Sequence, residues 1–458
     1  MRPEYQDFLA SKAPRQMAVG IEPSPMPSHL FDYQAACTEF CIRQGRAALF
    51  LDTGLGKTVC ELEFGRQAAV ATNGRALILT PLAVARQIET EGKRFGYHVR
   101  VIREQSDAAD GINICNYDRL DKLDTTSFGG VILDESSILK SFTGATTRAL
   151  IEAFAGTRFK LCATATPAPN DHMELGQHAE FLEVMPSNEM LARWFVSDQT
   201  EMGRYRLKKH GEQAFWDWMA SWARMAESPA DLGFDASRFG LPPLHVVRHR
   251  AIGIARPHKG SLFIEDVSAT NIHTIKRQTS KARAVALTEA VRKEADQPWV
   301  VWCDTDYEAD ALIQSLGDFA IEIRGSMTAE RKEDLHAAWM RGDRPALITK
   351  SSIFGYGMNW QYCARMAFVG RSFSYEAWYQ AVRRCWRFGQ TEPVHVHLIV
   401  ADGEDQIGRV IDRKAEGHAA MKRAMADAMR RDRAIGSELK VPYDPQHKAE
   451  FVQWLFAA

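Results

Sequence analysis

Short runs of β-branched and aliphatic residues recur along this chain, and longer segments with helical spacing separate them. In the first half the runs are Ala48–Leu51, Ala76–Leu79, Ile112–Ile114, Val131–Leu133 and Phe159–Cys162. In the second half they are Trp299–Trp302, Ala320–Ile323, Ala346–Ile348, Met366–Val369 and Val394–Val400. Apolar runs of this length that alternate with helices are typical of strands buried on both faces of a parallel sheet. The pattern predicts an α/β fold with two parallel-sheet domains in tandem.

Changes in composition divide the 458 residues into five segments. A Pro-rich, aperiodic stretch predicts an N-terminal arm over 1–27, and the two strand–helix alternations occupy 28–182 and 278–402. Between them, 183–277 has aromatic helical spacing followed by a Pro/Gly-punctuated passage, which predicts a helical insertion and linker. A charged helical extension is expected over 403–458. Large apolar side chains at helical spacing in the insertion and the extension favour core packing; they are Trp194, Trp216, Trp218, Trp222, Met421, Met425 and Met429.

The charge balance and the cysteines exclude several classes of protein. The chain has 57 Lys+Arg and 58 Asp+Glu, so it is not a polybasic coat for nucleic acid, although a local basic groove is compatible with this balance. Its eight cysteines are scattered, lack the paired spacing of a zinc site and read as reduced core thiols. We find no apolar run of about 20 residues and no signal-peptide pattern, so we expect no membrane association and a cytoplasmic location.

A glycine-rich turn follows the first predicted strand and precedes a predicted helix. Strand, glycines, Lys, Thr and helix stand in the order that a phosphate-binding loop requires. The glycines allow close backbone approach to phosphate, Lys57 would meet the β- and γ-phosphate charge, and Thr58 would bind Mg²⁺. Leu51 stands where the general pattern has another glycine. The alternative interpretation of the glycine-rich segment is a tight strand-to-helix turn with a surface lysine that binds no phosphate. The expected nucleotide-binding residues of the turn are Thr53, Gly54, Leu55, Gly56, Lys57 and Thr58.

Two carboxylates follow a later strand of the same predicted sheet. Asp134 and Glu135 come directly after Val131–Leu133. A nucleotide site needs such groups, because Asp134 would hold Mg²⁺, through water, while Glu135 would orient and activate the attacking water. The alternative is a solvated strand end. Together with the upstream loop, the pair predicts a site for ATP and Mg²⁺.

Several further motifs occur in a fixed order from Phe31 to Asp402. They are Phe31-Asp-Tyr-Gln34, Thr80-Pro-Leu82, Asn116-Tyr-Asp118, Asp134-Glu-Ser-Ser137, Ala163-Thr-Ala-Thr-Pro167, Ile323-Arg-Gly-Ser326, Phe354-Gly-Tyr-Gly-Met-Asn359 and Tyr379-Gln-Ala-Val-Arg-Arg-Cys-Trp-Arg-Phe-Gly-Gln390. This set resembles superfamily-two helicases of the DEAD/DEAH-box kind and, more narrowly, Swi/Snf-like ATPases, in the compact layout of phage and bacterial members. In two motifs the chain departs from the usual pattern, with Ser-Ser after Asp-Glu and Ala between the two threonines.

The resemblance implies two RecA-like domains that clamp ATP between them, and hence a nucleic-acid-dependent ATPase. Gln34 would read the adenine, and Gly357 of the second domain would complete the nucleotide site. Arg384 and Arg387 would reach across the cleft as arginine fingers, with Gln380 beside them, because the transition-state charge on the γ-phosphoryl oxygens needs fixed donors. Arg383 falls at a position that is variable in the family, and we interpret it as structural.

In the family the domains move along a nucleic-acid backbone, so the expected partner is double-stranded DNA, bound through phosphates in a salt-sensitive way. The expected track consists of loops at strand ends: Thr80, Pro81, Asn116, Tyr117, Arg324, Gly325, Lys350 and Ser351. The basic stretch Arg204–His210 is either a further DNA contact or a solvated face, and the helix Arg413–Arg433 reads as a surface helix.

These observations predict an ATP-dependent translocase on double-stranded DNA. One alternative is a strand-separating helicase on single-stranded DNA or RNA. Another is a nucleotide-switched module that loads or displaces proteins with little turnover. Replication, recombination or repair proteins are candidate partners, in a bacterial or phage-infected cell.

Overall fold

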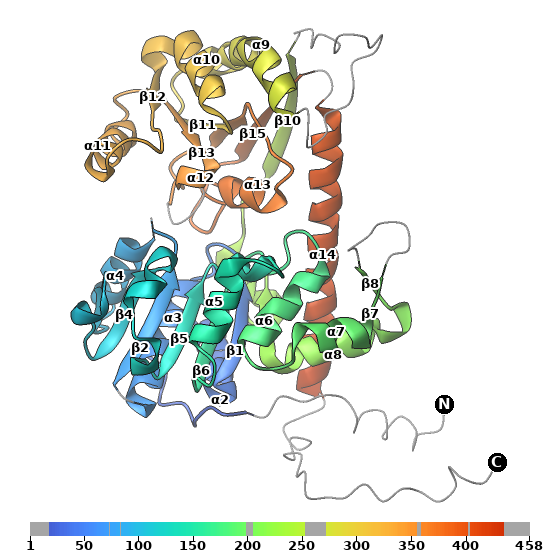
Figure 1. Cartoon of the computed structure of the whole chain (residues 1–458). Helices are drawn as coiled ribbons and strands as arrows, with labels where there is room; N and C mark the ends of the chain where they lie inside the picture. The colour runs from blue at the N-terminus through green and yellow to red at the C-terminus, as the bar shows by residue number, and fades with distance from the viewer. Residues whose placement is uncertain are drawn as a thin grey trace, which may run out of the picture.

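A computed structural model of the chain describes most of its length. The described residues are 18–72, 74–82, 84–197, 205–251, 272–354, 359–401 and 404–434. They form two domains, one above the other in Figure 1, with a long helix running beside both.

The first domain is built on a seven-stranded sheet in the order β3-β4-β2-β5-β6-β1-β9, in which every neighbouring pair is parallel. Its strands are β1 (Arg46–Leu51), β2 (Arg75–Thr80), β3 (Val99–Val101), β4 (Gly111–Asn116), β5 (Gly130–Asp134), β6 (Phe159–Ala163) and β9 (Ala223–Ala226). Its helices are α2 (Asp32–Gln44), α3 (Lys57–Ala71), α4 (Ala85–Arg94), α5 (Ala145–Ala153) and α6 (Leu175–Phe181). The carboxyl ends of β1, β2, β5 and β6 share one edge of this sheet, where ligands bind in open parallel sheets.

The second domain has a six-stranded parallel sheet in the order β10-β15-β14-β11-β13-β12. Its strands are β10 (Leu244–Ala251), β11 (Trp299–Cys303), β12 (Ala320–Glu322), β13 (Ala346–Lys350), β14 (Arg365–Phe368) and β15 (Val394–Ala401). Its helices are α9 (Ile272–Lys293), α10 (Asp306–Leu316), α11 (Ala329–Met340), α12 (Ser351–Phe354) and α13 (Tyr375–Val382).

Strand β11 explains why continuous apolar runs predicted this architecture. Trp299 and Val301 pack into one core cluster with α9 and α10, whereas Val300 and Trp302 pack into another cluster on the opposite face. Both faces of the strand are therefore covered. The predicted fold class, two tandem α/β domains with parallel sheets followed by a helical extension, is confirmed.

The segment 183–277 is less purely helical than the prediction. It contains the helices α7 (Ser187–Trp194) and α8 (Glu212–Trp222) and the hairpin β7 (Phe195–Ser197) and β8 (Tyr205–Leu207). It also supplies β9 to the first sheet and β10 to the second. The sequence signal for both strands is weak, because β9 is four residues with two alanines and β10 is an edge strand with mostly exposed side chains. The four tryptophans of this segment are buried, as predicted.

Helix α14 (Asp405–Ala434) extends along both domains (Figure 1). Near its start, Ile407 and Ile411 pack with Tyr375 of α13. Farther along, Met421, Met425 and Met429 belong to the core of the first domain, which confirms the predicted packing seam. Ion pairs Arg431–Asp217 and Arg224–Asp432, at 2.6 and 3.0 Å, fix the end of the helix to the first domain.

All eight cysteines are buried free thiols, as predicted. Among the described residues, no helix combines the length and the apolar character that crossing a bilayer would require.

Candidate nucleotide-binding and hydrolysis site

The predicted phosphate loop connects β1 to α3. Gly54 and Gly56 have φ angles of 94° and 72°, a region that disfavours other residues. A Cβ on Gly56 would lie 2.3 Å from Nε2 of Gln34, so any other residue here would displace the Gln34 amide. Lys57 begins α3, and its Nζ donates to the carbonyl of Leu51 at 3.0 Å, which folds the lysine over the loop. A loop that leads into a 15-residue helix presents N–H groups and the positive end of the helix dipole to an anion.

Helix α2 supports this loop from one side. Tyr33 Oη and Gln34 Nε2 donate to the carbonyl of Leu55 at 2.8 and 3.0 Å, and Gln34 Oε1 accepts from the N–H of Phe31 at 3.0 Å. The buried amide of Gln34 therefore fixes the loop. A contact of Gln34 with adenine stays a prediction, and it would require exchange of these hydrogen bonds.

The two predicted carboxylates lie at the carboxyl end of β5, between β2 and β6. The sheet order explains their partners: Thr80 Oγ1, from the end of β2, donates to Asp134 Oδ2 at 2.7 Å, and Thr164 Oγ1, after β6, donates to Glu135 Oε2 at 3.3 Å. Glu135 has φ 53° and ψ 50°, a left-handed conformation that is rare for a residue with a side chain. Such strain is typical of functional sites, where the surrounding structure imposes it.

The Ser-Ser pair that follows Asp-Glu makes contacts of its own. Ser136 Oγ lies 3.2 Å from His178 Nε2 in the first domain. Ser137 Oγ donates to Glu376 of α13 at 2.5 Å, and Lys140 forms an ion pair with the same carboxylate at 2.5 Å. The segment after Asp134 and Glu135 therefore connects the two domains directly.

The carboxylates lie in a buried, negatively charged environment. Burial raises the pKa of Asp134, and burial raises the pKa of Glu135 to about 7, against the lowering effect of the Lys57 and Arg384 charges. A divalent cation would offset the repulsion between the Asp134 and Glu135 carboxylates. The hydroxyl of Thr58 and the carboxylate of Asp134 are oxygen donors of the kind that Mg²⁺ prefers, so the residues present fit the metal that the sequence predicts.

Glu61 is a third carboxylate of this site, and sequence reasoning missed it. It lies on α3 one turn after Lys57, and side chains on a helix lean toward its N-terminus, here toward the phosphate loop. Its side chain is fully buried, and neither oxygen has a hydrogen-bond partner among the described residues. Burial first, and then the charge of Asp134, raise its pKa well above the usual value. In the sequence Glu61 is one of several polar residues of this helix, so nothing there distinguished it from a solvent-facing position.

We expect Glu61→Met to stabilise the nucleotide-free protein by about 1–2 kcal/mol, because a buried carboxyl without partners is costly. Equilibrium unfolding in urea measures the effect. The matched control is Glu63→Met in the same helix, since Glu63 is equally buried but bonds to Arg66 and Gln67 at 2.6 and 2.7 Å. That variant is expected to lose about 2–4 kcal/mol. A loss of stability in Glu61→Met would contradict the interpretation of Glu61 as a buried carboxyl without hydrogen-bond partners in the described part of the chain.

Helix α13 and the residues after it bring arginines to the site from the second domain. Arg384 donates to the backbone and side-chain oxygens of Gln380 at 3.0 and 2.9 Å, and its charge lowers the pKa of Asp134 and Glu135. Arg387 bonds to Asn359, and burial lowers its pKa to about 10. Gly357 lies outside the described residues.

Arg383, which the sequence suggested was structural, contacts the phosphate loop itself. Its Nη2 donates to the carbonyl of Thr53 at 2.7 Å and forms an ion pair with Asp52 at 3.2 Å. Sequence reasoning missed this contact, because it depends on how the second domain docks against the first.

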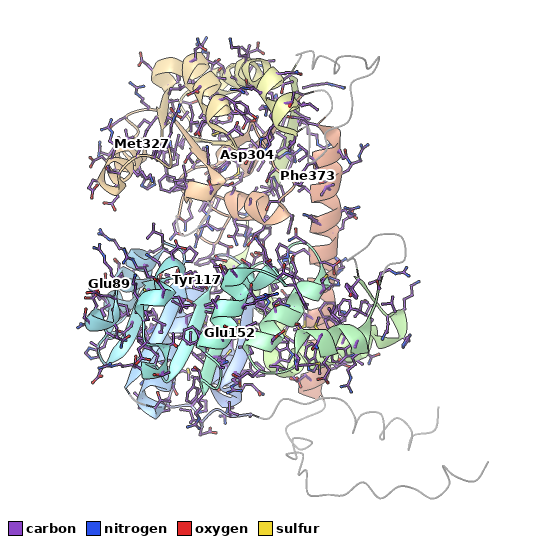
Figure 2. The ribbon with its side chains drawn as sticks, in the orientation of Figure 1. Glu89, Tyr117, Glu152, Asp304, Met327 and Phe373 are labelled. Carbon is purple, nitrogen blue, oxygen red and sulfur yellow. The ribbon has the colours of Figure 1, made fainter. Side chains whose placement is uncertain are left out.

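The structure separates the residues of the predicted nucleic-acid track. The hydroxyl of Thr80 is buried against the Asp134 carboxylate, and Tyr117 Oη donates to the main-chain carbonyl of Asp134 at 2.6 Å, so both hydroxyls are engaged by Asp134. Figure 2 shows Tyr117 on the side of the first domain that faces the second. Arg324 pairs with Glu322 and Asp310.

The remaining track residues lie nearer the surface. Lys350 pairs with Asp306 at 2.8 Å, Gly325 is exposed, and Asn116, Pro81 and Ser351 are half-buried at strand ends. In the basic stretch of the insertion, Arg204 lies outside the described residues. Lys208 Nζ donates to the last carbonyls of α7 at 2.9 and 3.0 Å, so this lysine stabilises a helix end.

The chain was compared with known proteins in sequence and in structure. No family model matches the chain. The chain is 24% identical to "Putative protein p41" of Acyrthosiphon pisum secondary endosymbiont phage 1, in a match that covers 84% of this chain and 95% of that protein. Among solved structures it is similar to the Sulfolobus solfataricus SWI2/SNF2 ATPase core in complex with dsDNA, with a TM-score of 0.42 and 16% identity over 91% of this chain and 97% of the other.

Proposed function

We propose that the chain is a Swi/Snf-like ATPase that hydrolyses ATP to ADP and phosphate between its two domains and moves along double-stranded DNA. One observation carries the ATPase part of the proposal. Lys57 of the phosphate loop, the pair Asp134 and Glu135 with their threonine partners, and Arg384 from the other domain converge on one place. Such a combination of cation, carboxylates and cross-domain arginine suits phosphoryl transfer.

Each residue has a chemical task in this proposal. Lys57 would exchange the carbonyl of Leu51 for the β- and γ-phosphates. Thr58 and Asp134 would hold Mg²⁺, which supplies positive charge to the phosphate oxygens. Glu135, oriented by Thr164, would accept the proton of the attacking water. Arg384 and Arg387 would donate to the γ-phosphoryl oxygens as charge develops on them, with Gln380 holding Arg384 in place.

The assignment of domains and partners belongs to the same proposal. Residues 28–182 would form the ATP-binding domain, 183–277 the insertion and 278–402 the second motor domain, between the arm 1–27 and the extension 403–458. Strand-end loops, among them those at Pro81, Asn116, Gly325 and Lys350, would contact the DNA backbone. The cytoplasm of a bacterial or phage-infected cell is the proposed location, and replication, recombination or repair proteins are the proposed partners.

The experiment that tests this function is the steady-state ATPase rate of the full chain, alone and with duplex DNA, single-stranded DNA or RNA. We expect duplex DNA to stimulate the rate severalfold, and the stimulation to fall as salt rises, because phosphate contacts release counterions. Stimulation by single strands only would favour the strand-separating alternative. ATP binding without stimulation by any nucleic acid would favour the protein-loading switch.

A further inference from the structure

A buried charge cluster joins the phosphate loop to the second domain and to α14. Its centre is Asp52, the first residue of the loop after β1. The hydroxyl of Tyr379 donates to Asp52 Oδ1, Arg383 Nη2 lies 3.2 Å from Oδ2, and Lys422 Nζ lies 3.7 Å from the same oxygen. Lys422 also contacts the Tyr379 hydroxyl at 3.3 Å and pairs with Glu227 at 2.8 Å. Asp52, Arg383 and Lys422 are all buried, so water screens their interactions little.

The cluster fixes the backbone of the loop as well as its side chains. Asp52 Oδ1 accepts from the N–H of Thr53 at 2.6 Å, and the carbonyl of Thr53 accepts from Arg383 Nη2 at 2.7 Å. In a trans peptide the C=O and the following N–H point in opposite directions. Turning the Thr53 carbonyl toward Arg383 therefore turns the N–H of Gly54 away from Arg383. That N–H is one of the donors that a phosphate loop offers to its ligand.

The charges of the cluster are balanced so that Asp52 stays ionised. Burial alone would raise the pKa of Asp52. Arg383, Lys422 and the hydrogen bond from Tyr379 together outweigh burial and hold the pKa at about 2. A permanently charged acceptor gives stronger hydrogen bonds than a neutral one. The loop is thus held by charge-assisted contacts from a different domain.

A second contact between the two domains does not involve the phosphate loop. Glu376 of α13 meets Ser137 and Lys140, and all three lie outside the phosphate loop. The two contacts connect the same two bodies, so a general weakening of domain packing would affect both. Of these two contacts, the Asp52 cluster is the one that touches the loop.

We propose that Arg383 is a positioning residue for nucleotide binding: through the Thr53 carbonyl and Asp52 it holds the phosphate loop in the conformation that accepts a triphosphate, and Tyr379 and Lys422 hold Asp52 in turn. This inference rests on the proposed function of the loop. It makes ATP affinity depend on the second domain and on α14 before any nucleic acid is bound.

The test is equilibrium binding of a fluorescent ATP analogue with Mg²⁺ to the full chain, without nucleic acid. Arg383→Gln is expected to weaken binding about tenfold or more, because one charge-assisted contact is lost. The KM for ATP should rise correspondingly, whereas kcat at saturating ATP should change much less, because Arg383 contacts the loop and not the reacting phosphate. The matched control, Lys140→Met, loses an ion pair between the domains and should bind the analogue as the unmodified chain does.

A double-mutant cycle makes the test decisive. Asp52→Asn and Arg383→Gln should each weaken binding, and the double variant should bind no worse than the weaker single variant, because the two residues act as a unit. Each single variant removes one charge of the buried Asp52–Arg383 ion pair and leaves the other, so the double variant, which removes both charges of this pair, decides the case if a single variant fails to fold. Normal affinity in Arg383→Gln or in the double variant overturns the inference. Failure of the unmodified chain to bind the analogue would instead overturn the proposed function, and this inference with it.

Discussion

Lys57→Ala is expected to reduce ATP hydrolysis by about a factor of 10²–10³, the effect of removing a donor that meets developing charge in a site shielded from water. The stability of the free protein should change little, because the Lys57 ammonium is only partly buried and its contact is the carbonyl of Leu51. The steady-state ATPase rate and a urea unfolding curve measure the two quantities on the same sample.

The control for this variant is Lys93→Ala. Lys93 is exposed on α4 and pairs with Glu89 on the same helix at 2.8 Å, so its loss removes one positive charge at a distance from the phosphate loop. Its ATPase rate should equal that of the unmodified chain. If hydrolysis survived in Lys57→Ala, the phosphate loop could not be the nucleotide site, and the proposed function would fall.

The second large effect is expected from Glu135→Gln. The glutamine keeps the shape of the side chain and can still accept from Thr164, but it cannot take a proton from water. Hydrolysis should therefore fall by about 10²–10⁴, the usual contribution of a general base. ATP binding should persist, since Lys57 and the loop are unchanged. Single-turnover hydrolysis together with analogue binding separates the two steps.

Glu152→Gln is the matched control, because Glu152 is exposed on α5 of the same domain. It should hydrolyse ATP at the normal rate. Retained hydrolysis in Glu135→Gln would assign the base to another group, and Asp134 and Glu61 would then be the carboxylates to examine. Loss of ATP binding together with hydrolysis would mean that Glu135 shapes the site rather than acts on water.

The sequence was sufficient for those parts of the site that lie within one element or at one strand end. Gly54, Gly56 and Lys57 are local to a single turn, and their chemistry can be read without knowing the rest of the fold. Asp134 and Glu135 follow a buried strand, and the carboxyl ends of parallel strands meet at one edge, so their proximity to the loop could be expected. The apolar runs likewise predicted both sheets, because strands covered on two faces need apolar side chains on both.

The parts that could not be predicted depend on packing between distant segments. Arg383 contacts Thr53 across 330 residues, and only the docking of two separate domains brings them together. In the sequence Glu61 looks like an ordinary solvent-facing residue of a helix, and only the folded structure shows that it is buried. Gln34 had a predicted partner in the nucleotide, but in the structure its amide donates to the carbonyl of Leu55. Strand β9 is too short and too rich in alanine to differ from a helix end in sequence.

The path of α14 has a mechanical consequence for any motor built on this chain. The polypeptide passes from the first domain to the second between β9 and β10, and it returns along α14, which ends in the core of the first domain. A domain that is attached at two separate points can still rotate, but it can neither move away from the other domain nor translate sideways. The line through the two attachment points defines the axis of that rotation. A stroke produced at the nucleotide would then be directed along one arc rather than lost in random displacement of the domains.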